Sequence, residues 1–317
     1  MSKNVIITGV TGQDGSYLAD LYVMRNYNVY GLTTSSNPKF TGNIEHLEGK
    51  IKLLTSNYTI ESLVGIFEEV KPDLVLNMAA QPLVQMSWSL ISETLAATAV
   101  IPSNILEAIV KVDPKIKFFQ ASSSEIYGDS NGKVFTEDSP LAPRNPYGCA
   151  KAYAYNMVKA FRSEMGIFAT NGVLFNHESS RRKDIFLSKK IIKNVIAIYK
   201  GESSVLELGN LFVERDWGHA KDYMSAVVAL MDMEDSGDYL ICSGKSKRVI
   251  DMANFVLGYF NLDPEDYIKV REEFIRKNEP VSCKGSPKKI ERDTGWIATT
   301  TFEEMLVEMI ECELKNE

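Results

Sequence analysis

The sequence predicts an α/β protein, built on a doubly wound parallel sheet and followed by a smaller C-terminal lobe. Across the first half of the chain, apolar β-branched runs alternate with longer segments of helical period, and spaced glycines follow the first run. The expected strands span residues 4–9, 28–32, 51–54, 73–79, 116–122 and 168–175. The expected helices occupy about 13–25, 60–70, 90–111 and 146–165.

The alternation weakens beyond residue 176. We expect polar loops at 176–184 and 209–218, a strand at 238–244 and a helix at 249–260. The sequence shows neither a repeat nor a low-complexity linker, so the later part is expected to fold back on the sheet. The predicted domains are residues 1–175, with the strand at 238–244 returning to their sheet, and residues 176–317, which mainly form the lobe.

Composition points to a small-molecule ligand. The 317 residues carry a formal net charge of −7 and show no basic cluster, which disfavours nucleic acid or an anionic membrane as partner. Four scattered cysteines and only three histidines predict neither a disulfide framework nor a metal site. No apolar run approaches the roughly 18 residues of a membrane span. The first residues resemble a strand more than a signal peptide, so we expect a protein of the reducing cytoplasm.

Three glycines follow the first expected strand in "TGVTGQDG". Gly9, Gly12 and Gly15 stand three apart at the start of a helix, with Gln13 and Asp14 between the last two. Glycines at this position permit a tight turn, and the helix N-terminus presents free N–H groups to a diphosphate. Spaced glycines alone also suit a plain turn. With a strand before and a helix after, they predict a Rossmann-type NAD(P)-binding loop.

The end of the second strand normally selects between NAD and NADP. Here "GLTTSSNPKF" offers the hydroxyls of residues 33–36, but neither an acid for the ribose nor an arginine for the 2′-phosphate. Lys39 is the nearest cation. The stretch is as compatible with a solvated polar loop as with a phosphate site.

"NPYGCAK" places Tyr147 and Lys151 four residues apart, which puts them on one face of the expected helix. A nearby ammonium favours the phenolate, and this brings the pKa of a tyrosine toward working pH. Such a pair also arises by chance. The stretch "QASSSEIYG" adds serine hydroxyls and Glu125 at the carboxyl end of the fifth strand, where open α/β sheets bind ligands. Together with the glycine loop, this serine stretch and the tyrosine pair predict an active site.

The same segments carry a family resemblance. "TGVTGQDGSYLAD", "NMAAQ", "QASSSEIYG", "PRNPYGCAKAYAY", "NGVLFNHESSRR" and "RDWGHAKDYM" resemble the extended short-chain dehydrogenase/reductase family, and its GDP-mannose 4,6-dehydratases in particular. The likeness covers most of residues 1–245 and becomes thin afterwards. It implies a nucleotide-sugar 4,6-dehydratase, in which sugar C4 is oxidised, water leaves across C5 and C6, and the hydride returns to C6.

The resemblance assigns the catalytic roles. Tyr147 would remove the 4-OH proton, and Lys151 would lower the tyrosine's pKa and hold the nicotinamide ribose. Glu125 would take the C5 proton, while Ser123 would hydrogen-bond the C4 oxygen. A carboxylate in a water-poor pocket suits proton removal beside a carbonyl.

The resemblance also assigns binding residues, and it implies no metal. The cofactor-binding residues would be Gly9, Gly12, Gln13, Asp14, Gly15, Thr33, Ser35, Asn57, Ala79, Ala80, Gln81, Tyr147 and Lys151. The substrate-binding residues would be Ser87, Asn176, Arg182, Arg215, Arg276 and Glu279. Arginine suits diphosphate oxygens, although each arginine is also compatible with a surface ion pair. His177 and His219 are expected to be structural.

Several departures from the family leave alternatives open. Thr33 and Thr34 replace an arginine pair, so the resemblance favours NADP while the residues predict a weak 2′-phosphate site and leave NAD open. The acid expected near adenine is replaced at Ser56 or Asn57, and Pro82 and Leu83 also differ from the family.

The expected substrate is GDP-mannose or a related GDP-linked hexose or heptose, and the expected assembly is a homodimer or homotetramer. The alternatives are a nucleotide-sugar epimerase or 4-ketoreductase, and a non-catalytic NAD(P)-binding protein.

Overall fold

The computed structural model describes residues 2–80, 84–275 and 279–316. Within them, seven parallel strands form one sheet in the order β10-β6-β5-β4-β1-β2-β3. The strands are β1 (Asn4–Thr8), β2 (Asn28–Thr33), β3 (Lys52–Thr55), β4 (Leu74–Asn77), β5 (Lys117–Ser123), β6 (Ala169–Leu174) and β10 (Asp238–Ile241). This sheet confirms the predicted fold class.

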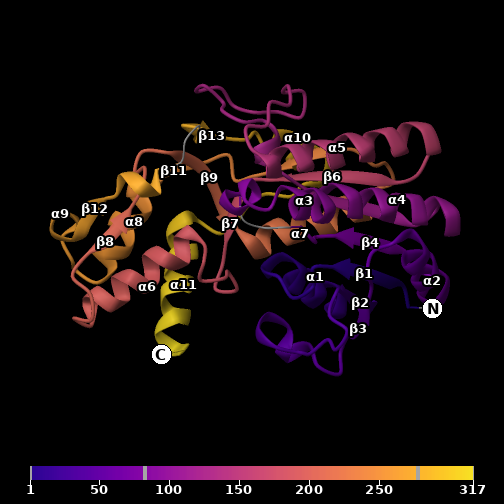
Figure 1. The fold of residues 1–317 in the computed structure, drawn as a ribbon, viewed down its shortest axis with the longest axis horizontal. Coiled ribbons are helices and arrows are strands. Elements are labelled where there is room, and N and C mark those ends of the chain that lie inside the picture. Colours follow the sequence, from indigo (N-terminus) through magenta and orange to yellow (C-terminus); the bar gives the residue numbers. More distant parts are fainter. Residues whose placement is uncertain (1, 81–83, 276–278, 317) are drawn as a thin grey trace.

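Helices cover both faces of the sheet (Figure 1). On one face, α1 (Gln13–Met24) and α7 (Ala220–Asp232) pack together over a core that continues into the strands. The other face carries α2 (Ile60–Val70), α4 (Ile101–Val112) and α5 (Pro146–Met165). Because strands covered on both faces are buried throughout, they read in the sequence as continuous apolar runs.

The helix expected at about 90–111 is confirmed as one helical stretch, Ile91–Val112, with a π-helical turn inside it. It consists of α3 (Ile91–Leu95), a π-helical turn (Ala96–Val100) and α4. The stretch Ile91–Val112 has the length and apolar composition of a membrane span, but it packs against α2 and α5 in the helix layer. Packing within the domain therefore explains its buried apolar residues, whereas Ile91, Leu95 and Val100 remain exposed.

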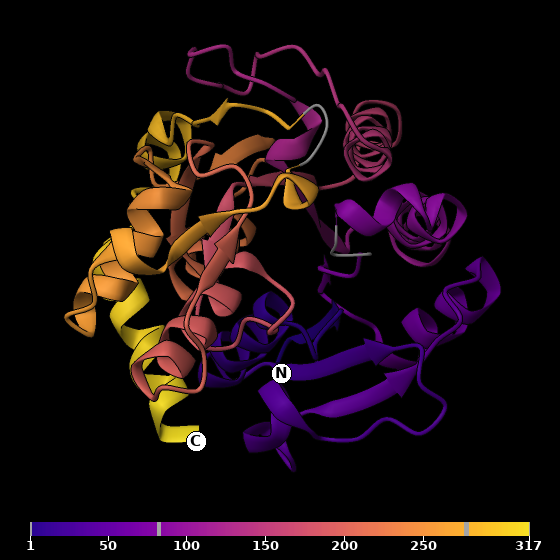
Figure 2. The same ribbon diagram turned by 60° about the vertical axis from the view of Figure 1, so that its left-hand side comes forward.

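A smaller lobe lies at the left of Figure 1 and has a core of its own. Its four-stranded sheet contains β7 (Asn176–Glu178), β9 (Glu214–His219), β11 (Ser246–Arg248) and β13 (Ser282–Cys283), while β8 (Leu206–Leu208) pairs with β12 (Ile268–Val270). The later helices are α6 (Leu187–Tyr199), α8 (Val249–Tyr259), α9 (Pro264–Tyr267), α10 (Lys288–Thr294) and α11 (Phe302–Asn316). Figures 1 and 2 both show α11 beside α6, and a buried Lys189–Glu313 ion pair of 2.7 Å joins them.

Two expectations for the second half were wrong. The segments 176–184 and 209–218 were expected to be polar loops, but they contain β7 and most of β9, which pair in parallel. Their polar and aromatic residues do not show the apolar pattern of a buried strand. The pairing also joins segments about 40 residues apart, so neither segment alone predicts it. The chain after residue 176 also returns α7 and β10 to the main sheet.

Asp216 on β9 connects the lobe to the end of β10. Its buried carboxylate accepts hydrogen bonds from the backbone N–H of Ser243 (2.8 Å), the Ser243 hydroxyl (2.7 Å) and the Gly244 N–H (2.9 Å). Burial raises the pKa of Asp216 to about 6, although these hydrogen bonds favour the ionised form.

Candidate active site

The turn after β1 requires glycine at positions 9 and 15 and leaves little room for a side chain at position 12. Gly9 has a φ of +65°, and a Cβ there would lie 3.0 Å from the Ala79 nitrogen. A Cβ on Gly15 would lie 2.4 Å from the Gly9 carbonyl oxygen, and one on Gly12 would lie 3.2 Å from it. Gly12 is the N-cap of α1 and provides no side-chain cap, so the helix begins with open N–H groups. This turn therefore fits the diphosphate of NAD or NADP.

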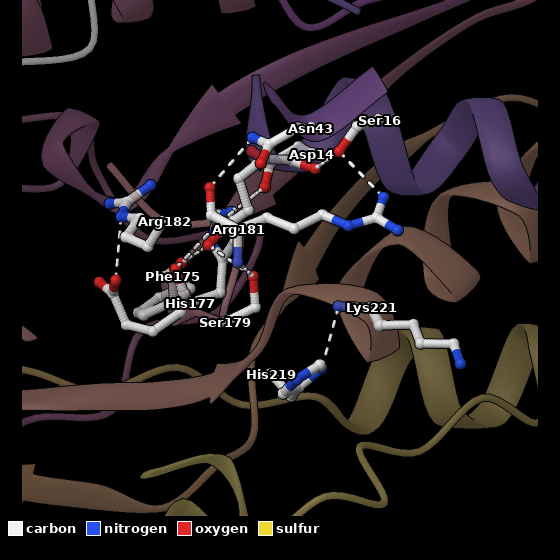
Figure 3. A network of polar contacts seen from close by, with 12 residues as sticks. Asp14, Ser16, Asn43, Phe175, His177, Ser179, Arg181, Arg182, His219 and Lys221 are labelled. Atoms are coloured by element: carbon white, nitrogen blue, oxygen red, sulfur yellow. Dashed lines mark hydrogen bonds and ion pairs between the residues drawn. The ribbon is translucent and has the colours of Figure 1, made fainter. Parts of the chain in front are cut away.

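Hydrogen bonds join the start of α1 to the segment that follows β6 (Figure 3). Gln13 donates to the His177 carbonyl (3.3 Å) and accepts from the Ser179 hydroxyl (3.0 Å). Asp14 lies 3.0 Å from Nε2 of His177, whose Nδ1 lies 2.7 Å from the Phe175 carbonyl. The glycine loop and the first residues of the lobe thus form one polar network.

The surroundings of His177 favour its positively charged form. Burial alone would lower its pKa, but Asp14 raises it above the usual value. Burial likewise opposes ionisation of Asp14, yet His177 and Arg182 lower the pKa of this carboxyl to about 2. Since the Phe175 carbonyl and the Asp14 carboxylate can only accept, both ring nitrogens of His177 donate. His177 therefore holds Asp14 in its ionised form at the glycine loop.

Arg181 also links the segment after β6 to α1, and this contact was not predicted from the sequence. Its guanidinium donates to the Ser16 hydroxyl (3.0 Å), pairs with Asp20 (2.7 Å) and lies 4.0 Å from the centre of the Tyr17 ring. Its carbonyl accepts from the Asn43 amide (3.0 Å). Figure 3 shows the side chain reaching from the lobe segment to α1.

The residues assigned to catalysis gather where β5 ends and α5 begins. Buried Lys151 donates from Nζ to the Ala121 carbonyl (2.6 Å) and lies 5.7 Å from the centre of the Tyr147 ring. Ser123, the last residue of β5, places its hydroxyl close enough to Tyr147 to act on the phenol's pKa. The geometry thus places a phenol, an ammonium and a hydroxyl together at the carboxyl edge of the sheet.

Glu125 is held beside this group by a residue that the sequence argument missed. The Asn145 amide donates to Oε2 of Glu125 (2.7 Å), and its carbonyl oxygen caps α5 by accepting from the Gly148 N–H (2.8 Å). A Cβ on Gly148 would lie 2.7 Å from the Glu125 carbonyl, so glycine allows the close approach of α5. Asparagine directly before Pro146 is a common helix start, and this signal was available in the sequence.

Burial controls both members of the tyrosine–lysine pair. It raises the pKa of Tyr147 above 10, although the Ser123 hydroxyl acts in the opposite direction. It lowers the pKa of Lys151 to about 8. The lowering of the tyrosine pKa expected from Lys151 is therefore outweighed by burial.

The remaining predicted cofactor residues follow β2, β3 and β4. Thr33 ends β2 and is partly exposed, as are Ala79 and Ala80 after β4, while Ser35 and Asn57 are exposed. Ala79 contributes an N–H that donates to the Thr8 hydroxyl (3.0 Å). The predicted Gln81 lies outside the described residues.

The predicted substrate residues occupy three different settings. Ser87 is buried and donates to the Val84 carbonyl (2.6 Å), whereas Asn176 begins β7 and is partly exposed. Arg182 pairs with buried Glu178 (2.9 Å) and acts electrostatically on Tyr147 and Asp14, which places it near the catalytic group.

Arg215 donates to the Pro280 carbonyl (2.9 Å) and lies 3.6 Å from Glu279. Arg276 lies outside the described residues. His219 pairs with Glu308 on α11 (2.9 Å), a contact remote from the tyrosine.

A cavity of about 840 Å³ lies between the lobe and the segment that follows β4. Its lining includes Gln85, Lys190, Asn194, Asn210 and Glu279. Gln85 begins a short 3₁₀ turn (Gln85–Trp88) that contacts α5, the helix that carries Tyr147. Within the described residues, no group of three or more His, Cys, Asp or Glu is placed to hold a metal ion.

Comparison with known proteins identifies the family. The family model for GDP-mannose 4,6 dehydratase matches residues 6–309. The chain belongs to the GDP-mannose 4,6-dehydratase family. Two relatives are the GDP-mannose 4,6 dehydratase of Homo sapiens, 35% identical with 99% of this chain and 92% of the relative covered, and the GDP-mannose 4,6-dehydratase of Vibrio cholerae serotype O1, 34% identical with 100% and 95% covered.

A solved structure shares the fold of this dehydratase. DesIV, the dTDP-glucose 4,6-dehydratase from Streptomyces venezuelae with NAD and TYD bound, superimposes with a TM-score of 0.89 at 18% identity, covering 99% of this chain and 97% of that one. The family membership makes the protein an enzyme, a hydro-lyase of the nucleotide-sugar 4,6-dehydratase type with a nucleotide sugar as substrate.

Proposed function

We propose that this dehydratase converts GDP-mannose, or a closely related GDP-linked hexose or heptose, to its 4-keto-6-deoxy derivative. One observation carries the proposal. Glu125 is held by Asn145 beside the Ser123–Tyr147–Lys151 group, so an acid suited to C5 accompanies the groups suited to C4. An epimerase or 4-ketoreductase that acts only at C4 needs no base for C5.

The first half of the proposed reaction takes place at C4. Tyr147 accepts the 4-OH proton, Ser123 hydrogen-bonds the C4 oxygen, and Lys151 is the cation placed to favour the phenolate once the site is filled. The glycine turn after β1 would hold NAD(P)⁺, which would supply the acceptor for the C4 hydride and the source of the hydride for C6. Lys151 is buried and Tyr147 is only partly exposed, which limits the access of bulk water to the proton path.

The second half removes water across C5 and C6. The new 4-ketone acidifies the C5 proton, which Glu125 accepts as its C–H bond breaks. The C6–O bond then breaks, and the proton taken by Glu125 is available to the departing hydroxide, so that one water leaves. Return of the hydride to C6 would leave an enolate, which takes up one proton at C5. In the overall balance, this proton replaces the one that Tyr147 removed from the 4-OH. Asn145 keeps the carboxylate oriented, because its amide donates to Oε2 while its carbonyl caps α5.

The rest of the chain is proposed to bind the two ligands. Residues 1–175, with β10, would hold the cofactor, while residues 176–317 would mainly hold the nucleotide sugar in the 840 Å³ cavity. Arg182 and Arg215 would approach the diphosphate. We also propose a soluble cytoplasmic homo-oligomer, a dimer or tetramer, which is supported by exposed apolar side chains at Ile91, Leu95 and Val100.

The substrate is tested by incubating the protein with GDP-, UDP-, dTDP- and CDP-linked sugars and following their masses. GDP-mannose or another GDP-linked sugar is expected to lose one water, and the Tyr147→Phe protein serves as the control. An isomer of unchanged mass would support the epimerase instead. Water loss confined to a UDP-, dTDP- or CDP-sugar would contradict the GDP assignment.

Asn145 offers a prediction that separates positioning from folding. In Asn145→Ser, the hydroxyl can still cap α5, but Glu125 loses its amide donor. We expect kcat to fall about tenfold, the size of effect that follows loss of one hydrogen bond to a charged group, with KM and melting temperature little changed. A wild-type kcat would show that Asn145 does not position Glu125.

A further inference from the structure

Near its carboxyl end, β2 lies against the glycine turn. A Cβ on Gly31, two residues before the end of β2, would lie 2.5 Å from Cγ1 of Val10 in the turn. In this fold, the residues that follow β2 meet the adenosine ribose of a dinucleotide held by the glycine turn. The inference below therefore rests on the dinucleotide site proposed above.

The polar groups of this segment already bond to each other. The Thr33 hydroxyl oxygen accepts from the Ser35 N–H (2.9 Å), and the Ser35 hydroxyl oxygen accepts from the Asn37 N–H (3.3 Å). The Ser35 carbonyl accepts from the Thr55 hydroxyl (2.7 Å). Two backbone N–H groups that a phosphate would need are thus used within the segment, whereas the hydroxyls of Thr33 and Ser35 still have a proton to donate.

The nearby cations do not replace these occupied N–H groups as partners for a 2′-phosphate. Arg181 reaches α1 from the lobe, but its guanidinium is already bound to Asp20 and Ser16 and stacked on Tyr17. Lys39 is exposed to solvent, where a single lysine is well screened. In the described part of the segment from 33 to 42, the chain presents no arginine.

We infer that Thr33 and Ser35 bind the ribose 2′-hydroxyl of NAD, and that this segment discriminates against NADP. A 2′-hydroxyl needs only neutral partners, which these two hydroxyls provide. A 2′-phosphate carries between one and two negative charges and needs charge-assisted hydrogen bonds to offset its loss of water. The net charge of −7 gives it no general attraction either.

Binding of NADH and NADPH to the intact protein tests the inference without turnover. The three tryptophans allow a fluorescence titration for each reduced cofactor. We expect NADH to bind at least about tenfold more tightly than NADPH, since one missing charge-assisted hydrogen bond is enough for that ratio. Thr34→Arg places a guanidinium at an exposed position and should tighten NADPH binding about tenfold, with NADH binding little changed.

Two controls make the result specific. Thr34→Gln adds a side chain of similar reach without the charge and should not tighten NADPH binding. Lys39→Gln should leave the NADH/NADPH ratio unchanged, and a loss of NADPH binding in this variant would show that the lysine serves a phosphate site. Thermal unfolding of each variant verifies that it folds.

The outcomes separate this inference from the proposed function. NADPH binding tighter than NADH binding in the wild-type protein would overturn the inference alone. Failure of both dinucleotides to bind would overturn it together with the proposed cofactor site. Preference for NADH without dehydration of any nucleotide sugar would support the inference and remove the proposed substrate.

Discussion

Tyr147→Phe is expected to lower kcat by about 10²–10⁴-fold, the usual contribution of a positioned acid–base group. The substitution removes only the phenolic oxygen, so the ring can still pack 5.7 Å from the Lys151 ammonium. Cofactor binding should change little, because phenylalanine keeps the shape of the site. The measurements are the rate of 4-keto product formation and a fluorescence titration with NADH or NADPH.

Tyr153→Phe is the matched control for this variant. Tyr153 lies on the same helix, but its side chain is 48% exposed and has no role in the proposed reaction. It should therefore retain wild-type kcat. Near-normal turnover in Tyr147→Phe would remove this tyrosine from the mechanism and leave the proton at the 4-OH without an acceptor.

The sequence predicted the parallel sheet well because its signal is local. A strand buried on both faces must be apolar along its length, as in β1 and β4, so each run marks a strand. The small lobe gave weaker signals. β7 is short, both β7 and β9 contain charged residues, and their pairing depends on tertiary contacts that no single stretch reveals.

The candidate site likewise combines local patterns, which the sequence shows, with contacts between distant residues, which it does not. The glycine turn and the Tyr147–Lys151 spacing are local patterns, and they were predicted from the sequence. The contact between Glu125 and Asn145 joins residues 20 apart, and the Asp14–His177 contact joins residues 163 apart. Neither partner could be assigned before the chain was folded.

The pKa values show why the chemistry of a pair cannot be predicted from spacing alone. Four residues of helix place Lys151 near Tyr147, which predicts a lower pKa for the phenol. The fold also buries both groups, which raises the pKa of Tyr147 and lowers that of Lys151 to about 8. The extent of burial depends on β5 and the surrounding layers, and this information lies outside the motif.

Glu125→Gln is expected to stop the reaction after oxidation. Glutamine has nearly the same shape, and its amide oxygen can still accept from the Asn145 amide, so the local structure should be retained. An amide is not a useful base at neutral pH. Tyr147 and the cofactor would still oxidise C4, but the C5 proton would have no acceptor, and overall turnover should fall about 10²–10⁴-fold.

Three measurements distinguish this block from a general loss of activity. The variant should accumulate reduced cofactor with a 4-keto sugar bound, because hydride transfer from C4 comes before the missing step. It should also lose exchange of the C5 proton with deuterated water and form little 4-keto-6-deoxy product. Glu164→Gln, at an exposed position on α5, makes the same chemical change outside the site and should behave as wild type. Wild-type deuterium incorporation and product formation in Glu125→Gln would exclude Glu125 as the C5 base, and the epimerase and reductase alternatives would then require a new test.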